Sequence, residues 1–190
     1  LRAGGAGTDA ALTAGLKWLA AQQLEDGSWP HDKYKAGVTG LALLALLGDG
    51  NTTTRGPYKD QVQAGVQWLV SKQNAQTGAL ADQRHAFFLY EHAIATTAIC
   101  EAYYFSMSPI LEGKAQSAVD FIVSARNPGA GWRYRVPPDG KSDSSVTCWM
   151  LLALASAREG KLEFDHDIFD EALAYLDSMT DPGTGRVGYD

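Results

Sequence analysis

The chain has 190 residues, of which 45% are hydrophobic and 20% charged, and its formal net charge is −6 at pH 7. This composition is typical of a globular domain with a sizeable core, and it excludes collagen-like and disordered chains. No basic cluster is present to neutralise phosphates, so we expect no nucleic-acid partner. The longest apolar run, 38–47, is about half of the ~20 residues that a bilayer-spanning helix needs. We therefore expect no membrane-spanning segment.

Apolar residues recur at helical spacing and never settle into alternation, so the sequence predicts an all-α fold without a substantial strand. Residues 1–8 have the composition of a linker, and 9–190 are predicted to form one domain, which we expect to be a piece of a longer protein. Glycine- and proline-rich turns separate about seven helices. In chain order, the predicted helices cover residues 9–23, 34–48, 58–74, 86–106, 112–126, 143–158 and 167–179.

Two kinds of helix alternate along the chain. The first kind is amphipathic and repeats at a period of about fifty residues, in AGLKWLAAQQ from 14, AGVQWLVSKQ from 64, SAVDFIVSAR from 117 and EALAYLDSMT from 171. The second kind is apolar most of the way round, in VTGLALLAL from 38, IATTAICEA from 94 and VTCWMLLAL from 146. A hairpin of one outer and one inner helix cannot cover its own inner helix, so the hairpins must stack. Both an open solenoid and a closed ring satisfy this requirement.

A glutamine, a glycine and a tryptophan recur where the first outer helix ends, in QQLEDGSW at 22–29. The glutamine is placed to bond exposed backbone groups, the glycine permits a positive φ, and the tryptophan folds back over the junction. The motif is therefore predicted to fasten the helix to its turn. Degraded copies follow later in the chain, with Gln73, Gly78 and Leu80 in the second, Arg126, Ala130 and Trp132 in the third, and Thr180 before TGRVGY in the fourth.

The first copy reproduces the QW motif with Gly15, Trp18, Leu19, Gln23, Gly27 and Trp29. Along essentially its whole length the chain resembles the superfamily of squalene-hopene cyclases and protein prenyltransferases. It looks closest to uncharacterised bacterial proteins built from prenyltransferase and squalene oxidase repeats, in phrases such as LKWLAAQQLEDGSW, YEHAIATTAICEAY and DSSVTCWMLLAL. The resemblance implies an α/α toroid. Such rings have up to six hairpins, so seven helices would form an incomplete ring whose missing part lies C-terminal to Asp190.

The chemical motifs of these families are not reproduced. Hopene-type cyclases protonate their substrate with an aspartate of D-x-D-D-T, whereas this sequence has DSSVT, in which Asp143 remains but Ser145 and Val146 replace the other acids. A lone Asp143 is better explained as a helix N-cap. Protein prenyltransferases bind zinc through D-x-C and a distant histidine. No D-x-C occurs, so we predict no metal and no cofactor.

The two cysteines, Cys100 and Cys148, lie inside apolar helical patterns and are predicted to be buried free thiols. A metal set of Cys148, Asp143 and His92 from neighbouring inner helices is the alternative interpretation.

In a toroid, the N-terminal ends of the inner helices meet at one rim, which suits anionic or hydrogen-bonding groups. We predict that a ligand binds there through Tyr34, Tyr90, Glu91, His92 and Asp143, and through Arg133, Tyr134 and Arg135 of the adjoining turn. Lys35 and His85 lie close enough in sequence to reach the same side. The alternative for 133–135 is a solvated turn.

Glu91 and His92 are the candidate catalytic pair, with Asp143 as a third candidate, because a carboxylate beside an imidazole suits acid–base chemistry. Adjacent helical residues point about 100° apart, however. The alternative is therefore that His92 bonds a turn carbonyl.

These observations favour a non-catalytic or catalytically unassigned repeat domain that binds a peptide or an apolar small ligand at the rim, within a larger parent chain. An isoprenoid cyclase or prenyltransferase-type enzyme with a non-standard acid is one alternative, and a structural scaffold is another. A cyclase needs a cavity walled by aromatic rings. Small inner residues favour close helix packing instead, among them Gly40, Ala42, Ala95, Thr96 and Thr97.

Overall fold

The computed structural model describes residues 6–129 and 131–190, and in this part of the chain the regular structure is entirely helical. This confirms the all-α prediction. The helices are α1 (Ala6–Ala21), α2 (Lys35–Gly48), α3 (Lys59–Lys72), α4 (Phe88–Ser106), α5 (Pro109–Ser124), α6 (Ser144–Glu159) and α7 (Asp167–Ser178). Residues 6–8 belong to α1 and not to a linker, whereas residues 1–5 and Ala130 of the third turn lie outside the described residues.

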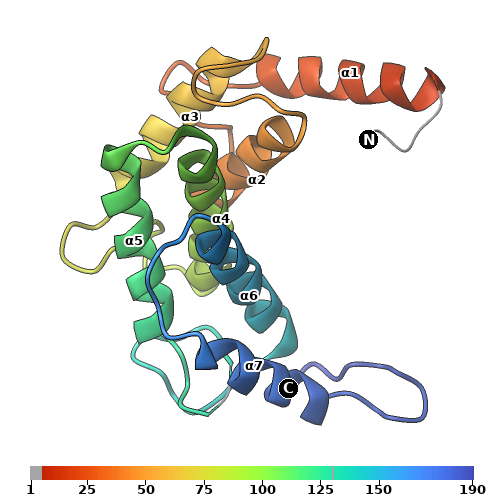
Figure 1. The fold of residues 1–190 in the computed structure, drawn as a ribbon, viewed down its shortest axis with the longest axis vertical. Helices are drawn as coiled ribbons and strands as arrows, with labels where there is room; N and C mark the ends of the chain where they lie inside the picture. The colour runs from red at the N-terminus through yellow and green to blue at the C-terminus, as the bar shows by residue number, and fades with distance from the viewer. Residues whose placement is uncertain (1–5, 130) are drawn as a thin grey trace.

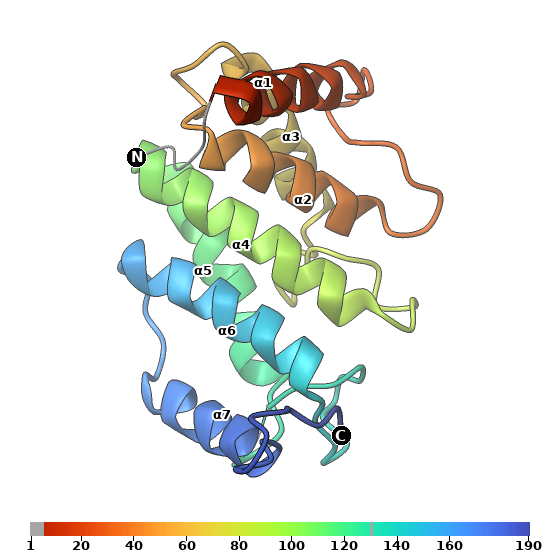
Figure 2. The ribbon, with the colours of Figure 1, turned by 90° about the vertical axis from the view of Figure 1, so that its right-hand side faces the viewer.

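The helices form two layers (Figures 1 and 2). The inner layer contains α2, α4 and α6 side by side, with α4 packed between the other two. Behind it, α3 packs against α2 and α4, and α5 packs against α4 and α6, while α1 and α7 lie at the two ends. From α2 to α6, successive helices therefore lie alternately in the two layers.

Small residues bring the inner helices into close contact. A Cβ atom added to Gly40 of α2 would lie 3.0 Å from Ile94 Cγ2 and 3.1 Å from the backbone nitrogen of Ala95, both in α4. Thr96 and Thr97 of α4 are also buried. At this crossing point the two helices therefore pack backbone against side chain.

The inner helices are not buried to the same degree. Helix α4 has neighbours on both sides and is buried along most of its length, including Cys100. Helices α2 and α6 each expose one apolar stripe, with Leu41 46% and Leu152 48% exposed. Cys148 lies on the same stripe of α6 and is exposed, against the prediction. The hydrophobic pattern misses this difference because it shows that a helix is apolar and not how many neighbours cover it.

The glutamines of the turn motif join successive repeats. The side-chain nitrogen of Gln23 donates hydrogen bonds to the carbonyl oxygens of Gly27 (2.8 Å) and Gln61 (2.9 Å), the second of which lies in α3. Gln73 repeats the pattern one hairpin later, with bonds to Gly78 (3.1 Å) and to Lys114 of α5 (2.9 Å). The motif therefore fastens the turn to its own repeat, as predicted, and also to the next outer helix.

Replacement of Gln73 by methionine removes both hydrogen bonds while keeping the side-chain length. We expect a loss of about 1–3 kcal/mol in the free energy of unfolding, since each bond contributes roughly 1 kcal/mol and two carbonyls lose a donor. Urea denaturation measures the loss. Gln67→Met, at an exposed position of α3, is the control, and equal stability of the two variants would contradict the role given to Gln73.

Gly78 is required for two reasons that a matched pair of variants separates. Its φ is +81°, and a Cβ atom there would overlap the carbonyl oxygen of Ser117 in the next outer helix. Gly140 has a φ of +79° but open space around it. We expect Gly78→Ala to lower the free energy of unfolding by about 1–3 kcal/mol more than Gly140→Ala, as measured by chemical denaturation. Equal losses would show that the repeats do not pack through this glycine.

Candidate ligand-binding rim

The inner helices are parallel, with their N-terminal ends together at the right of Figure 2. Tyr34, Phe87 and Asp143 occupy the N-cap positions of α2, α4 and α6. The predicted convergence of the helix ends is present in the structure.

Four aromatic rings join the three helix ends. The ring centroid of Phe87 lies 6.5 Å from that of Tyr34, 6.3 Å from that of Tyr90 and 5.4 Å from that of Tyr134. Tyr90 and Tyr134 are themselves 6.2 Å apart. Sequence reasoning missed Phe87, the centre of this cluster, although it holds the same N-cap position as Tyr34 in the preceding repeat.

Glu91 is only 5% exposed and uses one carboxylate oxygen to hold the neighbouring helix. Its Oε2 accepts a hydrogen bond from the backbone nitrogen of Gly37 (3.3 Å), in the first turn of α2. Its Oε1 accepts none, although His85 Nδ1 lies 3.5 Å away. Both atoms of this contact are buried without a hydrogen bond, so neither satisfies the other.

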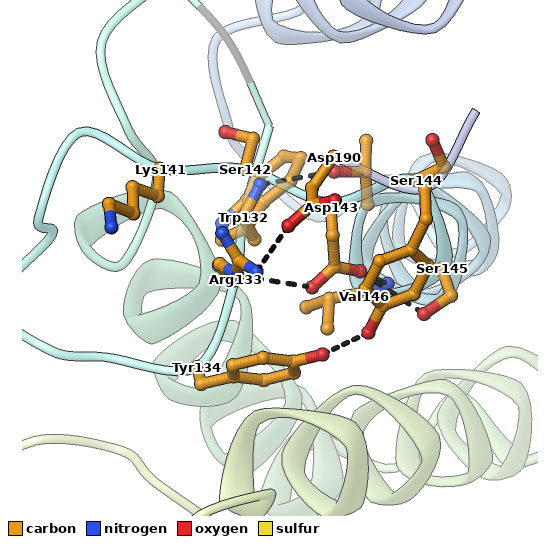
Figure 3. Close-up of polar contacts among 12 residues, drawn as sticks. Trp132, Arg133, Tyr134, Lys141, Ser142, Asp143, Ser144, Ser145, Val146 and Asp190 are labelled. Atoms are coloured by element: carbon orange, nitrogen blue, oxygen red, sulfur yellow. Dashed lines mark hydrogen bonds and ion pairs between the residues drawn. The ribbon is translucent and has the colours of Figure 1, made fainter. Parts of the chain in front are cut away.

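Asp143 is fully buried and is the N-cap of α6, as predicted. Its Oδ1 accepts hydrogen bonds from the backbone nitrogen of Val146 (2.9 Å) and the hydroxyl of Ser145 (3.1 Å). Its Oδ2 accepts none, and Arg133 Nε lies 4.0 Å away. Figure 3 shows the Arg133 side chain between Asp143 and Asp190, to whose carboxylate it donates at 2.6 Å.

The electrostatic character of the rim therefore differs from the prediction. We expected a rim that suits anionic or hydrogen-bonding groups, but Glu91 and Asp143 already bind the first-turn amides of α2 and α6 and make the rim less suited to anions. Four buried polar atoms in the described residues have no hydrogen-bond partner: His85 Nδ1, Glu91 Oε1, Asp143 Oδ2 and the Tyr175 hydroxyl. Two of these are carboxylate oxygens, which favour a hydrogen-bond donor or a cation over an anion.

His92 lies away from the aromatic cluster and is fully buried. Its Nδ1 accepts a hydrogen bond from the backbone nitrogen of Leu80 (3.1 Å), and its Nε2 donates to the carbonyl oxygen of Ala118 (3.1 Å). Burial lowers its pKa to about 4, so the ring is neutral near pH 7. The structure does not bring His92 together with Glu91. The alternative, that His92 bonds a turn carbonyl, is met only in part, because the turn residue Leu80 contributes its backbone N–H and the carbonyl belongs to Ala118 of α5.

The remaining predicted residues divide between the rim and solvent. Arg135 is exposed and approaches only Asp139, at 3.9 Å. This fits the solvated-turn alternative. The Tyr134 hydroxyl hydrogen-bonds that of Tyr189, and burial, followed by this hydrogen bond, raises the pKa of Tyr134. Tyr189 and Asp190 were also missed by sequence reasoning, because only folding returns the segment after α7 to the N-terminus of α6.

An apolar cavity of about 270 Å³ lies between the first turns of α2 and α4. Its lining consists of aromatic and aliphatic residues together with one acid, namely Tyr34, Gly37, Val38, Leu41, Phe87, Tyr90, Glu91 and Ile94. Three residues predicted to bind a ligand, Tyr34, Tyr90 and Glu91, are therefore brought to one cavity, whereas Arg133, Tyr134 and Asp143 lie beside it at the end of α6.

The part of the chain that the structure describes contains no group of three or more His, Cys, Asp and Glu side chains that could hold a metal ion. Cys148, Asp143 and His92 are not brought together. Of the helices in residues 6–129 and 131–190, none has both the length and the apolarity that crossing a bilayer requires. No family model, curated protein or solved structure matches the chain.

The depressed pKa of His92 predicts a loss of stability in acid. The unfolded chain binds the proton with a pKa near 6.5 and the folded chain with one near 4, so protonation favours unfolding as the pH falls from 6.5 to 4. At about 1.4 kcal/mol per pH unit, the loss reaches roughly 3 kcal/mol. His92→Asn keeps an acceptor for Leu80 but does not titrate, so we expect denaturation midpoints of this variant to vary less with pH in that window.

His166→Asn is the control for this measurement, because His166 is exposed. It should follow the pH dependence of the unaltered chain, since this variant keeps the buried imidazole of His92. Parallel pH profiles for His92→Asn and the unaltered chain would contradict the buried neutral imidazole.

Proposed function

We propose that this chain is a repeat domain of the prenyltransferase and squalene oxidase type, forming part of an α/α toroid, and that it binds a small ligand or a peptide at the rim. The alternation of outer and inner helices, the parallel inner layer and the glutamine contacts between repeats support the toroid arrangement.

The apolar cavity with Glu91 in its wall carries the proposed binding function. Glu91 is the one acid in this lining, and its Oε1 is a buried acceptor without a hydrogen bond. A ligand with a hydrogen-bond donor on an apolar body would suit this combination of a carboxylate with the rings of Tyr34, Phe87 and Tyr90. Apolar walls with a few placed polar groups are the usual composition of ligand sites.

The candidate catalytic residues do not support chemistry at the same place. His92 has both ring nitrogens engaged and lies outside the cavity, and Asp143 is held in its N-cap role beside Arg133. Glu91 alone of these candidates lines the cavity, and the predicted acid–base pair needs His92 beside it. We therefore propose a binding domain and no catalytic activity.

Saturation-transfer NMR with a fragment library containing isoprenoids, amines and short peptides tests the binding function. We expect fragments that bind the unaltered chain and lose their signal with Phe87→Ala, because that change removes the central ring of the site. Leu152→Ala, which removes an exposed apolar side chain of α6 outside the cavity, should retain the signals. Absence of binders, or equal signals in both variants, would overturn the proposal.

A further inference from the structure

We propose that the inner helices bind a guanidinium group, the head of an arginine side chain of a partner polypeptide, at the end opposite the rim. The site is a cavity of about 250 Å³ between the C-terminal halves of α4 and α6, which lie at the left of Figure 2. None of its residues lines the cavity at Glu91, so the inference goes beyond the proposed function. The lining consists of two acids, two aromatic rings and a hydroxyl, namely Glu101, Tyr104, Phe105, Ser156 and Glu159.

The two acids of this cavity lack a basic partner. Among the described residues, neither Glu101 nor Glu159 forms an ion pair with a lysine or an arginine. Burial raises the pKa of Glu101, and a hydrogen bond with Ser156 offsets this rise only in part. The charged form of Glu101 therefore lacks a stabilising neighbour, which a cation in the cavity would supply.

The helix ends add to the negative potential of this site. The C-terminal end of a helix carries a partial negative charge, and basic side chains in the last turn stabilise it. The last turn of α4 contains no basic residue. Helix α6 has Arg158 in its last turn, but this guanidinium lies over the ring of Phe169, 5.0 Å from the ring centroid. Both helix ends are therefore suited to a cation from outside the chain.

The repeat itself does not require an acid at position 101. The inner segments that begin at residues 38, 94 and 146 align without gaps, and Glu101 aligns with Ala45 of α2 and Ala153 of α6. A half-buried glutamate thus replaces the small apolar residue that the other two inner helices have at this position. Departures of this kind from the pattern of a fold are expected where function selects the residue.

The two rings supply a second attraction for a cation. The ring centroids of Tyr104 and Phe105 lie 5.3 Å apart, with 67° between the ring planes, and the residues are 47% and 40% exposed. A cation is drawn to the face of an aromatic ring. A guanidinium suits this combination better than an ammonium group does, because it is planar, stacks on a ring and still donates hydrogen bonds to carboxylates along its edge.

The size of the cavity favours a single side chain. Its volume of about 250 Å³ lies below the range of roughly 300–1,000 Å³ for drug-sized ligands. Arginine is also among the residues that most often anchor protein interfaces. We therefore take a polypeptide, and not a free metabolite, as the source of the guanidinium.

NMR chemical-shift titration of the full chain with N-acetyl-arginine methylamide tests the inference. Its citrulline counterpart has nearly the same shape without the charge, and its lysine counterpart carries an ammonium group. We expect the arginine compound to bind at least fivefold more tightly than either. Glu101→Gln and Glu159→Gln should each weaken the arginine compound at least threefold and leave the citrulline compound unchanged. Phe105→Leu should weaken the arginine compound more than the citrulline compound, because the ring face is lost.

Glu25→Gln is the matched control. It removes the same charge from an exposed acid that does not line this cavity, so it should leave all three affinities unchanged. Equal affinities for the arginine and citrulline compounds, or an arginine preference that survives both glutamate replacements in the cavity, would overturn the inference. Equal affinities for the arginine and lysine compounds would overturn the choice of a guanidinium.

Titration with n-propylguanidinium tests the source of the group. Weaker binding of this compound than of N-acetyl-arginine methylamide supports a polypeptide, because the peptide groups then add contacts. Binding of n-propylguanidinium alone would overturn the polypeptide as the source. All of these results are independent of Phe87-dependent binding at the rim, so the proposed function stands or falls separately.

Discussion

Within each repeat, one hydrogen bond between the turn and the inner helix recurs in the same place. The backbone N–H at the end of each turn donates to a side chain of the inner helix that follows, in the pairs Trp29 with Thr39, Leu80 with His92 and Trp132 with Thr147. Because these amides are buried, each needs its acceptor. The recurring bond fixes how far each inner helix advances relative to its turn, and therefore aligns the N-terminal ends of α2, α4 and α6. A histidine suggests catalysis, but His92 accepts the same hydrogen bond as Thr39 and Thr147 in the other repeats, and this structural role accounts for its position.

The alignment of the helix ends determines the chemistry of the rim. Helix N-termini that meet without caps would form an anion site, but at α2 and α6 a carboxylate already fills that role. Each carboxylate engages one oxygen and leaves the other without a hydrogen bond. A requirement of the fold thus places negative charge at the mouth of the inner layer, the reverse of what the helix dipoles alone would produce.

Sequence periodicity was sufficient for the helices and for their division into two layers, because both depend on local spacing and on apolar content. Three features escaped it. The exposure of Cys148 depends on how many helices cover α6. The place of Phe87 in the aromatic cluster depends on its contact with Tyr134, which belongs to a distant turn. The capping of α2 by Glu91 joins two residues from different repeats. In each case the deciding contact is between segments far apart in the chain, and no motif within one segment encodes it.

The two rim carboxylates are similar in burial and in helix capping but differ in access. The free oxygen of Asp143 faces Arg133, which also pairs with Asp190, so this carboxylate already has a basic partner within the chain. The free oxygen of Glu91 lies 3.5 Å from Nδ1 of the partly exposed His85, and in the described residues Glu91 forms no ion pair with a lysine or an arginine. An acid that is already paired adds little to ligand binding, since a ligand must first displace its partner. The difference in pairing, and not in residue type, therefore distinguishes the two ends of the rim.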